Sequence, residues 1–152
     1  MVVDTPEAMA ELGARIAAEL RAGDLVLLNG ELGAGKTTLT RGIGEALGVR
    51  GAVTSPTFVL ARTHPRVEGP PLVHVDAYRL RSAIELDDLD IDFSGSIVVV
   101  EWGAGLVDTL VDDWLSVDIE RSRGGDVAEE VEARQVTITA RGERWASSPL
   151  PG

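Results

Sequence analysis

The chain has 152 residues, with 25 acidic and 14 basic side chains and therefore a formal net charge of -11. This length predicts one domain around a single core, and the acidic balance argues against a broad basic surface, so any nucleic-acid role should be indirect. The absence of cysteine excludes disulfides, thiolate metal sites and cysteine nucleophiles. With no basic leader segment and no apolar run of about 20 residues, we expect a cytoplasmic protein without membrane contact.

The first expected element is an amphipathic helix that starts at Thr5. Threonine is a favourable N-cap, and Pro6 suits the first helical position, where its missing N–H does no harm. Apolar residues then recur at three- and four-residue spacing until Gly23 closes the segment. The pattern predicts about four turns that pack on a sheet through Met9, Leu12, Ile16 and Leu20.

Residues 25–38 combine an apolar run, a glycine-rich turn and a Lys-Thr pair. They satisfy GxxxxGK(S/T), the Walker A or P-loop pattern, in which glycines let successive backbone N–H groups approach phosphate oxygens. The flanks agree, since residues 25–28 predict a buried strand and residues 37–47 a helix whose N-terminus favours an anion. Lys36, the only lysine of the chain, would reach the β and γ phosphates, and the Thr37 hydroxyl would hold Mg²⁺.

Residues 54–57 place three hydroxyl side chains after a turn and before a strand expected at 58–61. In phosphate-loop proteins this part of the chain often senses the γ-phosphate, through a hydroxyl on Mg²⁺ or a backbone N–H. Thr54, Ser55 and Thr57 suit such a switch, but Ser-Pro-Thr is also an ordinary turn, and both interpretations stay open. Residues 63–71, with three prolines and a glycine, predict an exposed hairpin loop.

Residues 72–76 predict a strand ending in Asp76, at the strand end where open α/β sheets bind ligands. Asp76 could orient the attacking water or bind Mg²⁺ through water; alternatively it caps a helix or pairs with Arg79. His74 shares a sheet face with Asp76 and is expected to be structural. Residues 82–89 then predict a short acidic helix with a solvated face, and residues 92–95 predict a turn.

Residues 97–102 form a continuous β-branched run that ends in Glu101 and Trp102. Such a run is typical of a strand buried on both faces, and a carboxylate at its end is the second hallmark of phosphate-loop proteins, where it reaches Mg²⁺. Glutamate stands where aspartate is commoner, which leaves open whether Glu101 binds the metal directly or through water. Trp102 could belong to the core, cover the nucleotide or meet a partner.

Two alternating segments at 114–119 and 135–140 predict half-exposed strands joined by a polar loop with two glycines at its tip. We expect an antiparallel hairpin on the sheet edge. Arg134, at the end of the loop, could reach phosphate or base, although a solvated arginine is the simpler interpretation.

Taken together, GELGAGKTT at 30–38, SPTF at 55–58, HVDAYRL at 74–80 and VEW at 100–102 make the chain resemble the bacterial TsaE (YjeE) family. The resemblance runs from about residue 5 to residue 140. It implies an ATPase required for threonylcarbamoyladenosine at position 37 of tRNA. Members of that family act with the partners TsaB and TsaD, so tRNA would be met only indirectly.

The resemblance also assigns roles to individual positions. It places the Mg²⁺ ligands on Thr37 and Glu101, an acid needed for hydrolysis on Asp76, and the tryptophan beside the metal on Trp102. The loop at 122–130 is acidic and long for the family, which puts a nucleotide contact of Arg134 in doubt. The implied nucleotide contacts are Gly33, Ala34, Gly35, Lys36, Thr37 and Thr38.

The sequence therefore predicts an α/β, three-layer P-loop NTPase fold, with a central, mostly parallel sheet, antiparallel edge strands and a single domain over residues 1–152. The predicted activity is Mg-ATP hydrolysis, with Lys36, Asp76 and Glu101 as catalytic residues. Neither the phosphate loop nor the Glu101 strand contains an arginine, so turnover should be slow without a partner. The alternatives are a small-molecule kinase and a nucleotide-dependent binding switch without essential turnover.

Overall fold

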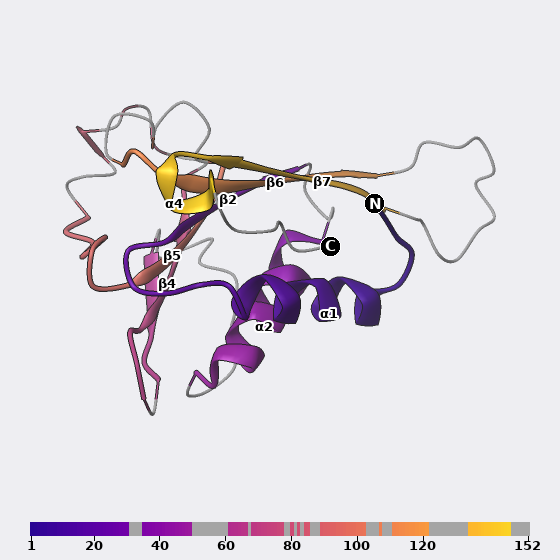
Figure 1. Ribbon diagram of the computed structural model, residues 1–152, viewed down its shortest axis with the longest axis horizontal. Helices are drawn as coiled ribbons and strands as arrows, with labels where there is room; N and C mark the ends of the chain where they lie inside the picture. The colour runs from indigo at the N-terminus through magenta and orange to yellow at the C-terminus, as the bar shows by residue number, and fades with distance from the viewer. Residues whose placement is uncertain are drawn as a thin grey trace.

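The computed structural model describes residues 1–30, 35–49, 61–66, 68–77, 80, 82, 84–85, 89–102, 107, 111–121 and 134–146. A seven-stranded sheet runs through the molecule in the order β1-β7-β6-β2-β5-β4-β3 (Figure 1). The strands are β1 (Val2–Val3), β2 (Leu25–Gly30), β3 (Ala61–His64), β4 (Leu72–Asp76), β5 (Ile97–Glu101), β6 (Trp114–Arg121) and β7 (Arg134–Arg141). Among the described residues, the helices whose bounds are defined are α1 (Pro6–Ala17), α2 (Lys36–Leu47) and the single turn α4 (Glu143–Ala146).

The middle of the sheet is parallel. Strand β2 lies between β5 and β6 and runs parallel to both, and β4 runs parallel to β5 on the far side. Among the described strands, antiparallel pairing lies toward the two sides of the sheet, where β7 joins β6, β1 joins β7 and β3 joins β4. The expected central parallel sheet with antiparallel edges is therefore confirmed.

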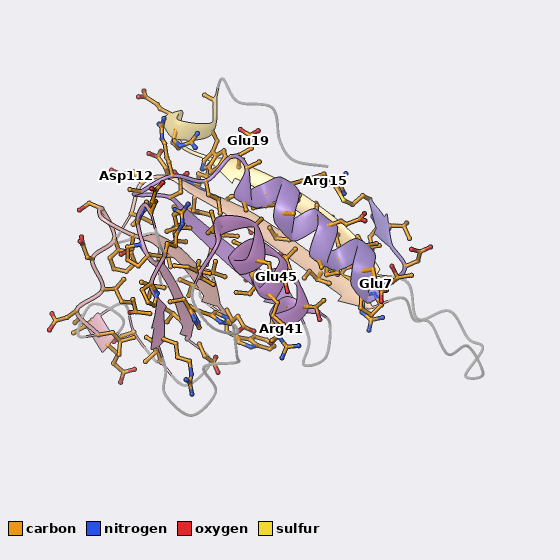
Figure 2. The ribbon with its side chains drawn as sticks, turned by 90° about the horizontal axis from the view of Figure 1, so that it is seen from below. Glu7, Arg15, Glu19, Arg41, Glu45 and Asp112 are labelled. Atoms are coloured by element: carbon orange, nitrogen blue, oxygen red, sulfur yellow. The ribbon has the colours of Figure 1, made fainter. Side chains whose placement is uncertain are left out.

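Both long helices cover one face of the sheet (Figure 1). The N-cap prediction for α1 is confirmed, since the Thr5 hydroxyl accepts a hydrogen bond from the Ala8 N–H at 3.0 Å. Figure 2 shows the outer surfaces of the helices, which carry exposed charges of both signs: Glu7, Arg15, Arg41 and Glu45. The inner surfaces of the helices pack on the sheet and form the main core. Its buried members include Met9, Leu12, Ile16, Leu39 and Ile43 from the helices and Val26, Leu28, Val99, Leu115 and Val117 from the strands.

Helices α1 and α2 touch at the level of their backbones. A Cβ on Gly13 would lie 2.5 Å from the carbonyl oxygen of Leu39, and a Cβ on Gly42 would collide with the backbone of Ala10. Only glycine permits this approach at the two positions. The close contact fixes the position of α2 relative to α1 and therefore the position of the N-terminus of α2.

A second cluster covers the opposite face of the sheet. Alternate residues of β2, β4 and β5 point to this side, because successive side chains of a strand face opposite ways. Residues from the connections that follow β4 and β5 complete the layer. The buried members are Leu25, Leu27, Val73, Val75, Ala77, Val98, Val100 and Val107.

Arg144 of α4 holds the start of β2 in place by binding Asp24. The Asp24 carboxylate, only 3% exposed, accepts hydrogen bonds from Arg144 Nε at 2.9 Å and from Arg144 Nη2 at 3.0 Å. Arg144 Nη2 also donates to the Glu19 carbonyl at 2.6 Å, and the Asp24 carboxylate accepts from the Arg21 N–H at 2.8 Å. A buried bidentate pair of this kind holds α4 against the turn that leads into β2.

Three sequence predictions need correction. Helix α1 ends at Ala17, not near Gly23, because i to i−3 hydrogen bonds tighten the chain after it: Glu19 donates to Ile16, and Leu20 to Ala17. The hairpin of β6 and β7 is antiparallel, as expected, but β7 is not the outermost strand, because the two-residue β1 pairs with it. The exposed loop expected from residue 63 begins later, because β3 extends to His64, which is buried.

Other expected elements agree with the structure where it describes them. The strands at 25–28, 72–76 and 97–101 and the helix at 37–47 are confirmed. The predicted turn at 92–95 is held by the Asp92 carboxylate, which accepts from the Gly95 N–H at 3.1 Å. Of the expected acidic helix, residues 82, 84–85 and 89 are described, and residues 84–85 have helical backbone. Among helices in the described part of the chain, none is long and apolar enough to cross a membrane.

Replacement of Gly42 by alanine should destabilise the protein, because its methyl group must push α1 away from α2. Overpacking of this kind costs about 1–3 kcal/mol, of which the better helix propensity of alanine offsets about 1 kcal/mol. Urea denaturation of Gly42→Ala measures the difference. Glu45→Ala, on the exposed side of the same helix, is the control and should change stability by less than about 0.5 kcal/mol. Equal stability of wild type and Gly42→Ala would contradict the close-packing argument.

His64 should make the fold acid-sensitive. Burial lowers the pKa of His64 from its ordinary value of 6.5, and the nearby His74 and Arg62 lower it further. The unfolded chain therefore binds a proton that the folded chain resists, so stability falls as the pH drops below about 6.5. Urea titrations at pH 8 and pH 5.5 should show a larger loss for wild type than for His64→Leu. Equal losses in the two proteins would refute this origin of the acid sensitivity.

Candidate functional site

Three strand ends meet at one edge of the sheet. Because β2, β5 and β4 are parallel neighbours, their carboxyl ends lie side by side. Gly30 ends β2, while Asp76 and Glu101 are register partners at the ends of β4 and β5. Ligands of open α/β sheets bind outside this edge, and here it carries two carboxylates beside the strand that enters the phosphate loop.

The N-terminus of α2 opens at the same place. Gly35, the residue before the helix, has φ 115°, and a Cβ there would also lie 3.1 Å from the Met9 side chain. The left-handed conformation explains the glycine, and the Gly35 carbonyl accepts the first helical bond from Leu39 at 2.9 Å. The first turn holds Lys36, Thr37 and Thr38 and no acidic residue. The N–H groups at a helix N-terminus and the positive end of the helix dipole favour an anion at this place.

Lys36 is buried at this edge, with only 5% of its surface exposed. Its ammonium donates to the Gly30 carbonyl at 2.6 Å and lies 4.4 Å from the ring centre of Trp102. Burial lowers the pKa of Lys36, while the charges of Glu101 and Asp76 act in the opposite direction and raise it. The two carboxylates thus keep a desolvated ammonium charged, at a position suited to bind a strongly anionic group.

Trp102 owes its position to an uncommon backbone conformation. Its φ is +64°, which costs a non-glycine residue about 1–2 kcal/mol. The Trp102 N–H donates to the Leu28 carbonyl at 3.2 Å, so the turn stays attached to β2. This turn directly after Glu101 brings the indole over the Lys36 ammonium, a cation–π arrangement.

Glu101 is held by a histidine. Nε2 of His74 lies 2.6 Å from Oε2 of Glu101, and the His74 side chain is completely buried. His74 and Glu101 come from neighbouring strands and face the same side of the sheet as α2. The contact involves Oε2 of Glu101, and the other carboxylate oxygen, Oε1, takes no part in it.

The donors at the site suit a hard cation. The Thr37 hydroxyl and the Glu101 carboxylate offer oxygen ligands, as Mg²⁺ prefers. Within the described residues, no group of three His, Asp or Glu side chains could hold a metal on its own. Phosphate oxygens and water would have to complete the coordination, which is the usual pattern for Mg²⁺ bound with a nucleotide.

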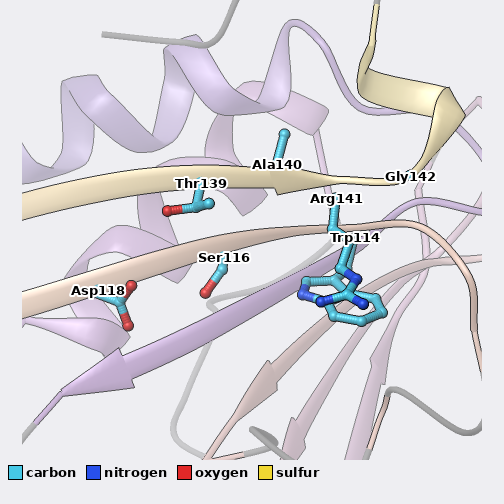
Figure 3. A pocket seen from close by; sticks show the side chains of 7 residues that line it. All are labelled: Trp114, Ser116, Asp118, Thr139, Ala140, Arg141 and Gly142. Carbon is cyan, nitrogen blue, oxygen red and sulfur yellow. The ribbon is translucent and has the colours of Figure 1, made fainter.

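A hollow of about 620 Å³ lies away from this edge, on the open face of β6 and β7 (Figure 3). Asn29, which precedes Gly30, supports the strand from this side by donating to Ser116 at 3.2 Å and Asp118 at 3.0 Å. Those two residues also line the hollow, as does Trp114, whose ring lies 5.2 Å from the Arg141 guanidinium. The hollow thus includes the two residues that bind Asn29, but Lys36, Asp76 and Glu101 do not line it.

A model of the family described as threonylcarbamoyl adenosine biosynthesis protein TsaE matches residues 3–131. The chain belongs to the TsaE family. The tRNA threonylcarbamoyladenosine biosynthesis protein TsaE of Streptomyces coelicolor is 63% identical over 146 residues, which cover 93% of this chain and 97% of that protein. The Bacillus subtilis protein of the same name is 37% identical over 142 residues, covering 92% and 84%.

A solved structure is also similar to this TsaE family member. The crystal structure of Bacillus subtilis YdiB superposes with a TM-score of 0.72 at 32% identity, covering 95% of this chain and 88% of YdiB. The predicted family and the α/β P-loop fold are both confirmed.

The structure places some of the predicted site residues of this TsaE family member together, places Arg134 apart from them, and does not describe the others. The structure brings Gly35, Lys36, Asp76, Glu101 and Trp102 to one edge of the sheet, with Thr37 and Thr38 in the first turn of α2. Arg134 begins β7, which β6 separates from β2. The other predicted contacts lie outside the described residues: Gly33, Ala34, Thr54, Ser55, Thr57 and Arg79.

The sequence did not indicate that His74 contacts a residue of the site. His74 was expected to be structural, yet it contacts Glu101 directly. The available signal was its position two residues before Asp76, which puts both side chains on the same face. The missing information was that β5 lies beside β4, because strand neighbours cannot be read from alternation alone.

Nucleotide binding should weaken at alkaline pH, and the onset should depend on Glu101. An anion needs the charged form of Lys36, whose pKa is already lowered by burial and is raised again by Glu101 and Asp76. In metal-free buffer, Glu101→Gln should therefore begin to lose affinity for a fluorescent ATP analogue at a lower pH than wild type. Glu120→Gln removes an exposed carboxylate from the end of β6 and should behave as wild type. An identical onset in wild type and Glu101→Gln would contradict the electrostatic coupling.

Proposed function

We propose that this chain is a P-loop ATPase that hydrolyses Mg-ATP in association with TsaB and TsaD and is required for the threonylcarbamoyladenosine modification of tRNA. The observation that supports this most strongly is the buried Lys36 ammonium, flanked by two carboxylates and a glycine-initiated helix N-terminus. The relatives are named for tRNA threonylcarbamoyladenosine biosynthesis, which supplies the biological context.

Each residue has a definite task in the proposed reaction. The N–H groups at the start of α2 bind phosphate oxygens, and Lys36 exchanges the Gly30 carbonyl for the β and γ phosphates. Thr37 and Glu101 would hold Mg²⁺, which would neutralise charge on the phosphates. Asp76, half-buried beside Glu101, orients the attacking water so that the reacting atoms are aligned.

Trp102 restrains Lys36 before the nucleotide arrives. Its ring and the Gly30 carbonyl both contact the ammonium, so a phosphate group has to compete with two existing interactions. A triphosphate offers several full negative charges and wins this competition more easily than a singly charged anion. The arrangement favours a nucleotide over small acidic metabolites.

The partners in this proposal are TsaB and TsaD. With a net charge of -11, this chain is poorly suited to hold tRNA itself, so the partners would carry the tRNA contacts. The phosphate loop and the strand before Trp102 contain no arginine to stabilise the transition state. Hydrolysis should therefore be slow for the isolated chain and faster with the partners.

Steady-state Mg-ATP hydrolysis, with and without TsaB and TsaD, tests the proposal. Wild type should turn over slowly alone and about tenfold or more faster with the partners, and Lys36→Ala should abolish both rates because phosphate binding is lost. Arg41→Ala, which removes an exposed cation from the same helix, should retain the stimulation.

Different failures point to different corrections. Equal rates with and without partners would refute the coupling, and a phosphorylated product from a candidate metabolite would identify a kinase. Rapid turnover by the isolated chain would refute the partner dependence. If Asp76→Ala binds ATP and partner and still supports normal modification, hydrolysis is not essential and the chain is a binding switch.

A further inference from the structure

The contact between His74 and Glu101 joins a fully buried side chain of β4 to a carboxylate at the charged edge of the sheet. His74 pairs with Val99 in the register of β4 and β5, and Glu101 lies two residues beyond Val99 on the same face. Their side chains are diagonal neighbours, with Nε2 and Oε2 at 2.6 Å. Glu101 is 6% exposed and His74 is fully buried, so water does not compete for this hydrogen bond.

The environment of His74 indicates which nitrogen carries the proton. Within the described residues, Nδ1 is buried and has no hydrogen-bond partner. An unpaired N–H at Nδ1 would cost about 1–3 kcal/mol, whereas a proton on Nε2 is shared with the Glu101 carboxylate. The hydrogen bonding thus assigns a proton to Nε2, which donates to Oε2 of Glu101.

We propose that His74 is a positioning residue that orients Glu101 toward a divalent cation, an inference that rests on the proposed function. By donating to Oε2, His74 fixes the carboxylate plane and leaves Oε1 to face the cation or its water. A glutamate needs such a restraint more than an aspartate, because its side chain has one more rotatable bond to immobilise. Glu101 then contributes one oxygen and not two.

Packing alone does not account for a histidine at this position. The other inward residues around it are aliphatic, including Leu72, Val99 and Ile97, and a buried polar ring is costly unless it is hydrogen-bonded. His64, the only other histidine, is also buried on the neighbouring strand, and its Nε2 has no partner in the described part of the chain. His64 therefore offers a matched control for the loss of a buried imidazole.

The decisive experiment measures metal affinity directly. Mn²⁺ binding to the full chain saturated with a non-hydrolysable ATP analogue is followed by electron paramagnetic resonance for wild type, His74→Leu, His74→Gln and His64→Leu. Loss of a side chain that supports a metal ligand typically weakens metal binding about 10–100-fold, so His74→Leu should bind Mn²⁺ at least about tenfold more weakly. The loss expected for His74→Leu corresponds to at least about 1.4 kcal/mol of binding free energy. His74→Gln keeps an N–H donor at similar reach and should restore the Mn²⁺ affinity to within about threefold of wild type.

The controls separate positioning from general damage. Affinity for the analogue without metal should be the same in all four proteins, and His64→Leu should bind Mn²⁺ as wild type does. Equal losses in His64→Leu and His74→Leu, or unchanged Mn²⁺ affinity in His74→Leu, would overturn the inference. A His74→Gln variant that folds but fails to rescue would also overturn it.

A measurement on the unaltered protein covers the case in which His74→Leu does not fold. Nitrogen-15 NMR of the two imidazoles at pH 8 should show His74 protonated at Nε2 and bare at Nδ1, and a proton on Nδ1 would overturn the inference. Failure of the proposed function looks different, because wild type itself would then show no metal-dependent nucleotide binding. Metal-dependent binding by wild type with the opposite His74 tautomer would reject only the positioning role.

Discussion

The buried ammonium of Lys36 is the interaction on which the rest of the structure depends. A desolvated cation is unstable unless opposite charge lies close by, and two strand ends supply it in Glu101 and Asp76. Those carboxylates reach Lys36 only because β4 and β5 lie in parallel register beside β2. The order of the strands therefore places the two carboxylates beside Lys36, and their charges make the burial of this lysine possible.

Several features of the fold hold this arrangement in place. The Asp24 and Arg144 pair secures the start of β2, and Asn29 secures its end through β6. The glycine contact between α1 and α2 sets the height of the helix that carries Lys36. Two residues with left-handed backbone, Gly35 and Trp102, turn the chain at the charged edge, and only Trp102 incurs a steric cost for it. Rigid support around a few strained positions is typical of a preorganised site.

The two faces of the sheet contribute differently. The face under α1 and α2 carries Leu72, His74 and Asp76 in succession on β4, so it changes from apolar core to charged edge within five residues. His74 stands at this transition and links the two environments through its bond to Glu101. The opposite face is aliphatic on β2, β4 and β5 and polar on β6 and β7, where Ser116 and Asp118 brace Asn29. Core packing and site geometry are thus built from the same strands by alternation.

The sequence by itself determined the local features of this protein. Three patterns identified the fold class, the family and the charged edge. They are the spacing of Gly30, Gly35 and Lys36, the apolar runs of β2 and β5, and the acid that ends each of β4 and β5. These features could be predicted because turn chemistry and side-chain alternation depend on neighbours in the chain. The tertiary structure alone decided that β6 inserts beside β2, that α1 ends at Ala17, that Trp102 covers Lys36 and that His74 holds Glu101. Those outcomes depend on contacts between residues distant in sequence, and a local pattern fixes the face on which a residue lies but not the strand that lies beside it.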